Sequence, residues 1–148
     1  MKKIFDAQQI RQWDAYTIAQ EPITSIDLME RASEAFTDRL LALFSNKDFV
    51  IFCGKGNNGG DGLAIARILT SINKKVEVYV IEYSAQASSD FLIIQKRFAK
   101  LAPIHSIRSM KDFPDIGQNS VVVDAMLGSG TNRPVEGILK MVIQEINQ

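Results

Sequence analysis

A short apolar segment that runs straight into a glycine-rich loop is the feature that most restricts how this chain can fold. The apolar residues 49–53 end at Gly54, and the next eight residues, Lys-Gly-Asn-Asn-Gly-Gly-Asp-Gly, contain four more glycines. From Leu63 onward, apolar residues recur with helical spacing. A strand, a glycine-rich turn and a helix in this order are typical of parallel α/β sheets that bind ligands at the strand ends.

The rest of the chain continues the alternation of helices and strands. The patterns predict helices at 7–20, 25–44, 88–101 and 138–146, and strands at 49–53, 76–82, 104–107 and 120–124. On the second helix, the stripe that contains Met29 and Phe36 is predicted to face the core. This alternation predicts a three-layer α/β/α domain, doubly wound around a mostly parallel, Rossmann-like sheet.

Length and composition limit the function classes. A chain of 148 residues has room for one domain. Its 17 basic residues balance its 17 acidic ones, so no overall charge attracts nucleic acid or an anionic membrane. The single cysteine, Cys53, cannot form an internal disulfide, and no apolar run is long enough for a signal peptide or a membrane span. We therefore expect a cytoplasmic protein without a nucleic-acid or membrane partner.

The glycine-rich loop, residues 54–62, is predicted to bind an anion such as a phosphate. Glycines permit positive φ and let backbone N–H groups approach a ligand, and the following helix presents the positive end of its dipole. The alternative is a tight turn without a ligand, although a turn does not need two asparagines and Asp61. Because the loop lacks the Gly-Lys-Ser/Thr ending of a Walker A loop, Lys55 is predicted to be a solvated charge.

A second loop begins at Asp124, at the end of the strand predicted at 120–124. If the strand order is 3-2-1-4, both loops flank the crevice where the order reverses. Asn57, Asn58, Asp61 and Asp124 would then reach one ligand. A carboxylate that leaves an apolar strand is costly to bury unless it is paired, coordinated or catalytic, with capping of its own loop as the alternative. Oxygen-bearing side chains without a His or Cys cluster favour a hard cation.

Two segments resemble a known family. GKGNNGGDGLAIARIL at 54–69 and VVVDAMLGSGTNRPVEG at 121–137 resemble the paired motifs of the NAD(P)H-hydrate epimerase family, the YjeF N-terminal domain. Asp14 and residues 28–32 look like the opening helices of that family. The resemblance implies an isomerase that interconverts the R and S hydrates of NADH and NADPH (NADHX and NADPHX), in which water has added to C6 of the nicotinamide ring. The ring nitrogen would help to expel hydroxide, and water would add again from either face.

The resemblance also implies a set of site residues. Asp61 and Asp124 are the acid–base candidates, and their roles stay unassigned at this point. Asn58 and Asp124 would ligate one potassium ion per subunit. The substrate would contact residues of both loops: Asn57, Asn58, Gly59, Gly60, Asp61, Gly128, Ser129, Gly130, Thr131, Asn132, Arg133 and Pro134.

Members of that family continue with further strands, so residues 1–148 are expected to form one YjeF N-terminal-like domain that is incomplete on its C-terminal side. The resemblance implies a homodimer, and an ATP- or ADP-dependent dehydratase that is fused to the chain or separate from it. One alternative is a non-catalytic nucleotide-binding or protein-interaction module of the same fold. Another is a Rossmann oxidoreductase that offers Glu77 or Glu82 to a ribose.

Overall fold

A parallel sheet forms the centre of the computed structural model, which describes residues 4–131 and 134–148. Its strands are β1 (Asp48–Cys53), β2 (Val76–Ile81), β3 (His105–Ile107) and β4 (Ser120–Ala125). Within the described residues the strand order is β3-β2-β1-β4, and every neighbouring pair is parallel. The chain thus places β2 on one side of β1 and β4 on the other, so the condition under which both loops flank the crevice beside β1 is met.

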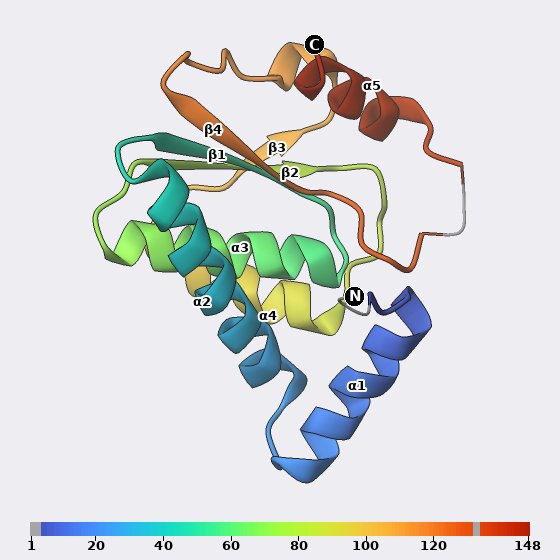
Figure 1. Ribbon diagram of the computed structural model, residues 1–148. Coiled ribbons are helices and arrows are strands. Elements are labelled where there is room, and N and C mark those ends of the chain that lie inside the picture. The colour runs from blue at the N-terminus through green and yellow to red at the C-terminus, as the bar shows by residue number, and fades with distance from the viewer. Residues whose placement is uncertain (1–3, 132–133) are drawn as a thin grey trace.

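Helices cover both faces of this sheet (Figure 1). One layer holds α2 (Ser25–Phe44), α3 (Asn57–Ser71) and α4 (Ser89–Phe98), and the other holds α5 (Gly137–Ile146) and the short 3-10 helix η1 (Met110–Asp112). Each interface has its own cluster of buried apolar side chains. The three-layer α/β/α prediction is therefore confirmed. No helix in the described residues is long and apolar enough to cross a membrane.

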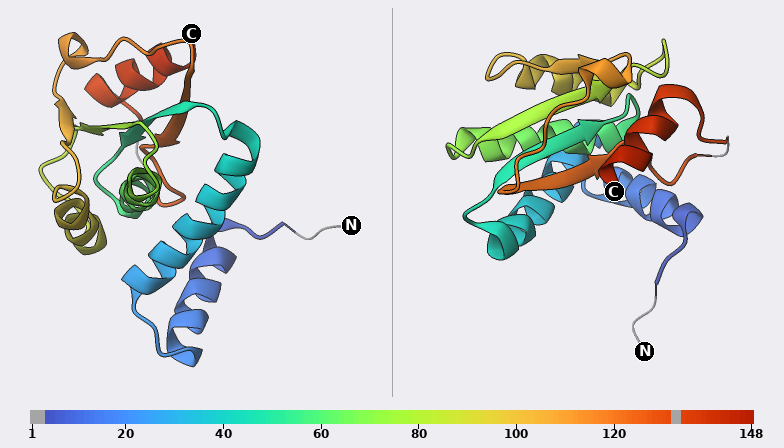
Figure 2. Two further views of the ribbon diagram at one scale, coloured as in Figure 1. Left: turned by 90° about the vertical axis from the view of Figure 1, so that its left-hand side faces the viewer. Right: turned by 90° about the horizontal axis from the view of Figure 1, so that it is seen from above.

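Helix α1 (Ala7–Gln20) projects from the α/β body and lies beside α2 (Figure 2). The Asp6 side chain caps its first turn by accepting from the N–H groups of Gln8 and Gln9, each at 2.8 Å. None of the α1 residues is buried, and Trp13 and Tyr16 are more than half exposed. The predicted helix is confirmed, but its apolar residues add nothing to the core.

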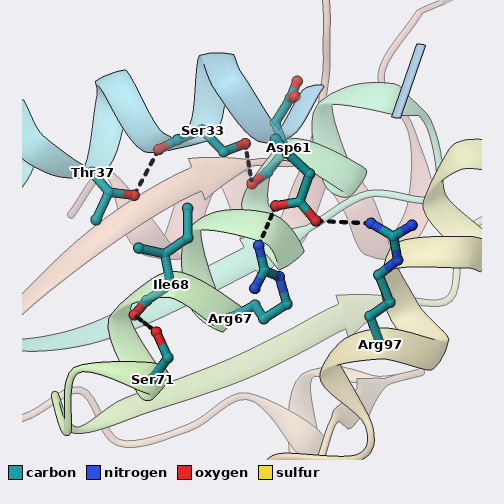
Figure 3. Close-up of polar contacts among 8 residues, drawn as sticks. Ser33, Thr37, Asp61, Arg67, Ile68, Ser71 and Arg97 are labelled. Carbon is teal, nitrogen blue, oxygen red and sulfur yellow. Dashed lines mark hydrogen bonds and ion pairs between the residues drawn. The ribbon is translucent and has the colours of Figure 1, made fainter. Parts of the chain in front are cut away.

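The predicted core stripe of α2 is only partly right. Met29 is buried, whereas Phe36 is 48% exposed. Polar Ser33 and Thr37 are buried instead, because Thr37 Oγ1 donates to the Ser33 carbonyl at 2.7 Å and Ser33 Oγ donates to the Asp61 carbonyl at 3.4 Å (Figure 3). The buried face consists of Ile26, Met29, Ser33, Thr37 and Leu40. These hydrogen bonds satisfy the two hydroxyls and so allow them to lie on the buried face, whereas Phe36 lies outside it.

Helix α3 begins at Asn57, earlier than the expected start at Leu63, so four of the loop's residues predicted to precede the helix, Gly59, Gly60, Asp61 and Gly62, lie in its first turns. A Cβ on Gly59 would lie 1.9 Å from the carbonyl oxygen of Gly54, and a Cβ on Gly62 would lie 2.5 Å from the Cβ of Ala125. No glycine in the 54–62 segment has positive φ. The positive φ that glycine permits is therefore not used in this segment, where Gly59 and Gly62 let α3 lie close to β1 and β4.

Glu30 on α2 joins three helices. Its carboxylate accepts from Arg67 on α3 and from Arg97 on α4, the latter at 3.1 Å. The Glu30 side chain is only 15% exposed. Its partly desolvated charge therefore depends on both arginines.

Replacing Glu30 with Gln should lower the free energy of unfolding by about 1–3 kcal/mol, because both guanidinium groups lose their charged acceptor. Chemical denaturation measures the change. Glu21→Gln is the matched control: Glu21 pairs with Arg31 at 2.7 Å, but both side chains are about half exposed. That variant should lose less than about 1 kcal/mol. Equal losses in the two variants would contradict the importance of the buried contact.

Candidate active site

A cavity of about 520 Å³ lies where β1, β2 and β4 end. Its walls come from Arg11 and Asp14 on α1, from residues 56–58 and Asp61 at the start of α3, from Tyr83 after β2, and from residues 126–131 after β4. The two predicted loops thus meet on one cavity. They do so because β1 and β4 are neighbours whose following segments leave the same edge of the sheet. We call this space the main cavity.

A smaller cavity of about 240 Å³ shares part of this wall. Asn58 and Asp61 line both spaces, whereas Asp124 and Phe36 line only the smaller one. The structure therefore brings three of the four predicted polar residues onto one small cavity, and Asn57 onto the adjoining main cavity. The exposed ring of Phe36 forms a part of the wall that the sequence had assigned to the core.

The start of α3 offers backbone donors to the main cavity. Gly56 is its N-cap residue, in an extended conformation with φ −95° and ψ −170°, and no side chain in the described structure caps this helix end. The N–H groups of the first turn have no acceptor within an α-helix, and the helix dipole adds partial positive charge there. Anion binding at this helix end stays a prediction that this geometry supports.

Asn58 and Asp124 each use one side-chain atom to hold the loop after β4. Asn58 Nδ2 donates to the Leu127 carbonyl at 3.0 Å, which leaves the amide oxygen as an acceptor. Asp124 Oδ1 accepts from the Met126 N–H at 3.0 Å, so the capping role considered from the sequence is present. The expected desolvation of Asp124 is wrong, because β4 is an edge strand of the described sheet and this side chain is exposed.

Asp61 is the carboxyl group that burial affects most in this region. Desolvation raises its pKa from 3.8 to about 6, and the nearby Asp14 carboxylate adds to the shift. The group is therefore about half protonated near pH 6 and about one-tenth protonated at pH 7. A carboxyl group with such a pKa can donate a proton to a substrate and later take one back.

The raised pKa predicts how stability varies with pH. Because folding favours the protonated form of Asp61, its contribution to stability is complete below about pH 4 and is lost as the pH rises to about 6. Asp61→Asn removes this dependence, so the variant should be more stable than the parent above pH 6, by up to about 3 kcal/mol. Denaturation at pH 4 and pH 7 tests this. An equal difference at both values would contradict the raised pKa.

Oxygen atoms dominate the possible metal ligands here. Among the described residues, no group of three or more His, Cys, Asp or Glu side chains is placed to hold a metal ion. Asn58 and Asp124 line the same small cavity, and each keeps an oxygen atom that forms no hydrogen bond within the described structure. Such a donor set fits a hard cation of low charge better than zinc or iron.

Comparison with known proteins decides the family. Residues 25–148 match the family model described as YjeF-related protein N-terminus. The chain belongs to this family. It is 40% identical over 143 residues to the NAD(P)H-hydrate epimerase of Limosilactobacillus fermentum, which covers 95% of this chain and 66% of that relative. It is 37% identical over 147 residues to the NAD(P)H-hydrate epimerase of Limosilactobacillus reuteri, covering 98% and 68%.

The chain spans about two thirds of the length of the curated relatives that it matches. A crystal structure of a yeast protein has the same fold, with a TM-score of 0.79 at 19% sequence identity, and the match covers 98% of this chain and 65% of the yeast chain. The family recognised from the motifs and the α/β fold class are therefore both confirmed.

Not every predicted site residue of this YjeF-type domain lies on the cavity wall. Gly59 and Gly60 are buried, and neither lines the main cavity. A Cβ on Gly60 would lie 2.9 Å from Met29, so both glycines serve packing, and their contact with a substrate stays a prediction. Pro134 lines an adjoining cavity of about 810 Å³ that shares Tyr83 and Thr131 with the main one. Asn132 and Arg133 lie outside the described residues.

Lys55 is not the solvated charge that the sequence predicted. Its side chain is 16% exposed, and Nζ pairs with Glu82 at 2.8 Å because the loop after β1 packs beside the end of β2. The acidic residues that an oxidoreductase would offer to a ribose are thereby engaged: Glu82 binds Lys55, and Glu77 accepts from the Tyr79 hydroxyl at 2.9 Å. The oxidoreductase alternative has no free carboxylate at either position.

Sequence reasoning missed Arg11, Tyr83 and Phe36 as wall residues of this YjeF-type site. Tyr83 follows β2 closely, so the rule that parallel strands end at one edge could have found it. Arg11 and Phe36 depend on how α1 and α2 sit beside the sheet. No short sequence pattern specifies that placement.

Proposed function

We propose that this chain is an NAD(P)H-hydrate epimerase, an isomerase that interconverts the R and S hydrates of NADH and NADPH. The proposal rests mainly on one observation: Asp61, whose pKa is raised to about 6, lies on a cavity shared by both family motifs. Similarity to the relatives named NAD(P)H-hydrate epimerase supports the same substrate.

The reaction needs one carboxyl group and no redox step. In the hydrate, C6 of the nicotinamide ring bears a hydroxyl group and is bonded to the ring nitrogen N1. Protonated Asp61 donates its proton to that hydroxyl as the C6–O bond breaks, and the N1 lone pair forms the C6=N1 bond of an iminium ion. A water molecule then adds to the other face of C6, and the Asp61 carboxylate takes the proton that this water releases. Asp61 ends the cycle protonated, as it began.

The remaining polar groups hold the substrate in this scheme. The N–H groups at the start of α3 and the loop of residues 128–131 face the main cavity, where they would bind the phosphates and orient the ring. Asn57 lies beside them and would contact the ring amide. Asn58 and Asp124 would hold a potassium ion, whose positive charge would favour binding of the anionic substrate.

Replacing Asp124 with Asn should raise the potassium concentration needed for half-maximal activity about tenfold or more, because Asp124 is the charged one of the two proposed ligands. Epimerase assays in potassium titrations, with choline keeping the ionic strength constant, measure this. Asp115→Asn, on the loop before β4, is the control and should leave the midpoint unchanged. An unchanged midpoint in the Asp124 variant would contradict the assignment.

The cavity would also suit a non-catalytic module that only binds a nucleotide. A coupled assay distinguishes epimerisation from binding alone. The R hydrate of NADPH is mixed with a dehydratase that consumes only the S hydrate, with and without this chain. Epimerisation predicts faster loss of the R hydrate when the chain is present. Binding of NADPH without faster loss would support the non-catalytic alternative.

The proposed reaction and the exposed face of α1 also suggest an oligomeric state, a partner enzyme and a cellular location. We propose a homodimer formed through α1, because Ile10, Trp13 and Tyr16 are exposed there. The S hydrate that the reaction forms is the substrate for an ATP- or ADP-dependent dehydratase, and such a reaction is expected in the cytoplasm with the cofactor pool. Light scattering on the purified chain tests the dimer.

A further inference from the structure

Helix α1 brings a cationic side chain to a site whose other walls are neutral or acidic. Arg11 lines the main cavity opposite the start of α3 and the loop after β4. Among the described residues that line this cavity or the adjoining one of about 810 Å³, Arg11 is the only Lys or Arg. Any positive side-chain charge that the described walls offer to a ligand therefore comes from α1.

The Arg11 guanidinium is available for a ligand. It is exposed, and no hydrogen bond or ion pair to another described residue occupies it. Other cations of the described structure are engaged elsewhere: Lys55 pairs with Glu82, and Arg67 and Arg97 pair with Glu30. Arg11 thus differs from these residues in facing a cavity with its donors free.

The acidic groups around the cavity determine where an anion can sit. Asp14 lies one helical turn after Arg11 on α1, and Asp61 lies on the α3 side. Both carboxylates would repel a phosphate in this cavity, so its binding needs a cationic side chain that offsets the repulsion. The guanidinium of Arg11 offers several N–H donors in a planar fork that matches phosphate oxygens.

We propose that Arg11 binds the pyrophosphate of the dinucleotide substrate and so directs the nicotinamide end toward Asp61. The inference rests on the proposed function for the identity of the ligand. It makes α1 part of the substrate site, although none of the helix's residues belongs to the core. Arg11 is then a specificity-determining residue that selects phosphate-bearing forms of the nicotinamide.

Binding measurements without turnover test this role. NADPH fluorescence is titrated with the parent chain, Arg11→Gln, Arg11→Lys and the control Arg39→Gln, at low ionic strength. Arg39 is exposed on α2 and lines neither cavity. We expect Arg11→Gln to raise the Kd for NADPH about tenfold and Arg11→Lys to raise it less, because lysine keeps the charge but loses the fork. Arg39→Gln should stay within twofold of the parent.

Dihydronicotinamide riboside, which carries no phosphate, provides the second probe. Its Kd should be the same for the parent chain and Arg11→Gln if Arg11 acts on the pyrophosphate. An NADPH Kd within twofold of the parent, or an equal loss for the riboside, would overturn the inference. If the parent chain binds NADPH through Arg11 but does not epimerise the hydrate, the proposed function fails while this inference stands.

Discussion

Replacing Asp61 with Asn is expected to lower kcat for hydrate epimerisation by a factor of about 10²–10⁴, the usual contribution of a positioned acid–base group. The amide has the same shape as the carboxyl group, but it can neither protonate the departing hydroxyl nor take a proton from water. Loss of the fold cannot explain such a result, since removing a partly buried charge should stabilise the chain above pH 6.

The pH profile of the parent chain gives an independent test of the same role. Because the reaction starts from protonated Asp61, kcat should fall as the pH rises above about 6. Asp38→Asn, at an exposed position of α2, is the matched control and should keep both the rate and the profile. An Asp61→Asn variant with more than half of the parent kcat would contradict the assignment.

The Gly59→Ala variant is expected to lose about 3 kcal/mol or more of its free energy of unfolding. The added Cβ would lie 1.9 Å from the carbonyl oxygen of Gly54 and 2.7 Å from its carbonyl carbon. Both are backbone atoms, so no rotation of a side chain relieves the clash. Helix α3 would have to move away from the end of β1, and with it Asn58 and Asp61.

Gly56→Ala is the matched control in the same segment. A Cβ at Gly56 would meet no atom within 4 Å, and φ of −95° suits alanine. The loss of a glycine N-cap should cost less than about 1 kcal/mol. Urea denaturation followed by circular dichroism compares the two variants. Equal midpoints would show that close packing does not explain the glycine at position 59.

Most of the fold could be predicted from local patterns. The apolar segments at 49–53 and 120–124 are each bounded by polar or glycine residues, so their strands were found within one residue of β1 and β4. The strand order 3-2-1-4, considered from the sequence as a condition, is also the observed one, and it places both loops at one edge of the sheet. A short segment in which the apolar residues follow one regular spacing is enough to predict a strand or a helix.

The wrong predictions concern residues whose burial or pairing depends on segments that are distant in the sequence. Phe36 has the spacing of a core residue, but α2 buries a face that includes Ser33 and Thr37, whose hydroxyls form hydrogen bonds there. Lys55 has the position of a solvated loop residue, but Glu82 on the next strand end pairs with it. Both outcomes depend on contacts between elements, which spacing along one element does not encode.

The candidate site also has features that the sequence could predict and features that it could not. Asn58, Asp61 and Asp124 could be grouped because each follows or ends a strand at one sheet edge. The difference between the two carboxyl groups could not be predicted, since it comes from burial beside α2 and Asp14 for Asp61 and from the open edge of β4 for Asp124. Only the packed structure distinguishes a buried acid from an exposed loop cap.

The most direct test uses the separated R hydrate of NADPH in water enriched with oxygen-18. The chain is added at pH 6 in potassium buffer. The two hydrates are separated by chromatography, and their molecular masses are measured by mass spectrometry. Epimerisation by loss and re-addition of water predicts that the S hydrate forms much faster than in buffer alone and carries one heavy oxygen atom. An S hydrate that forms no faster than in buffer would contradict the proposed function.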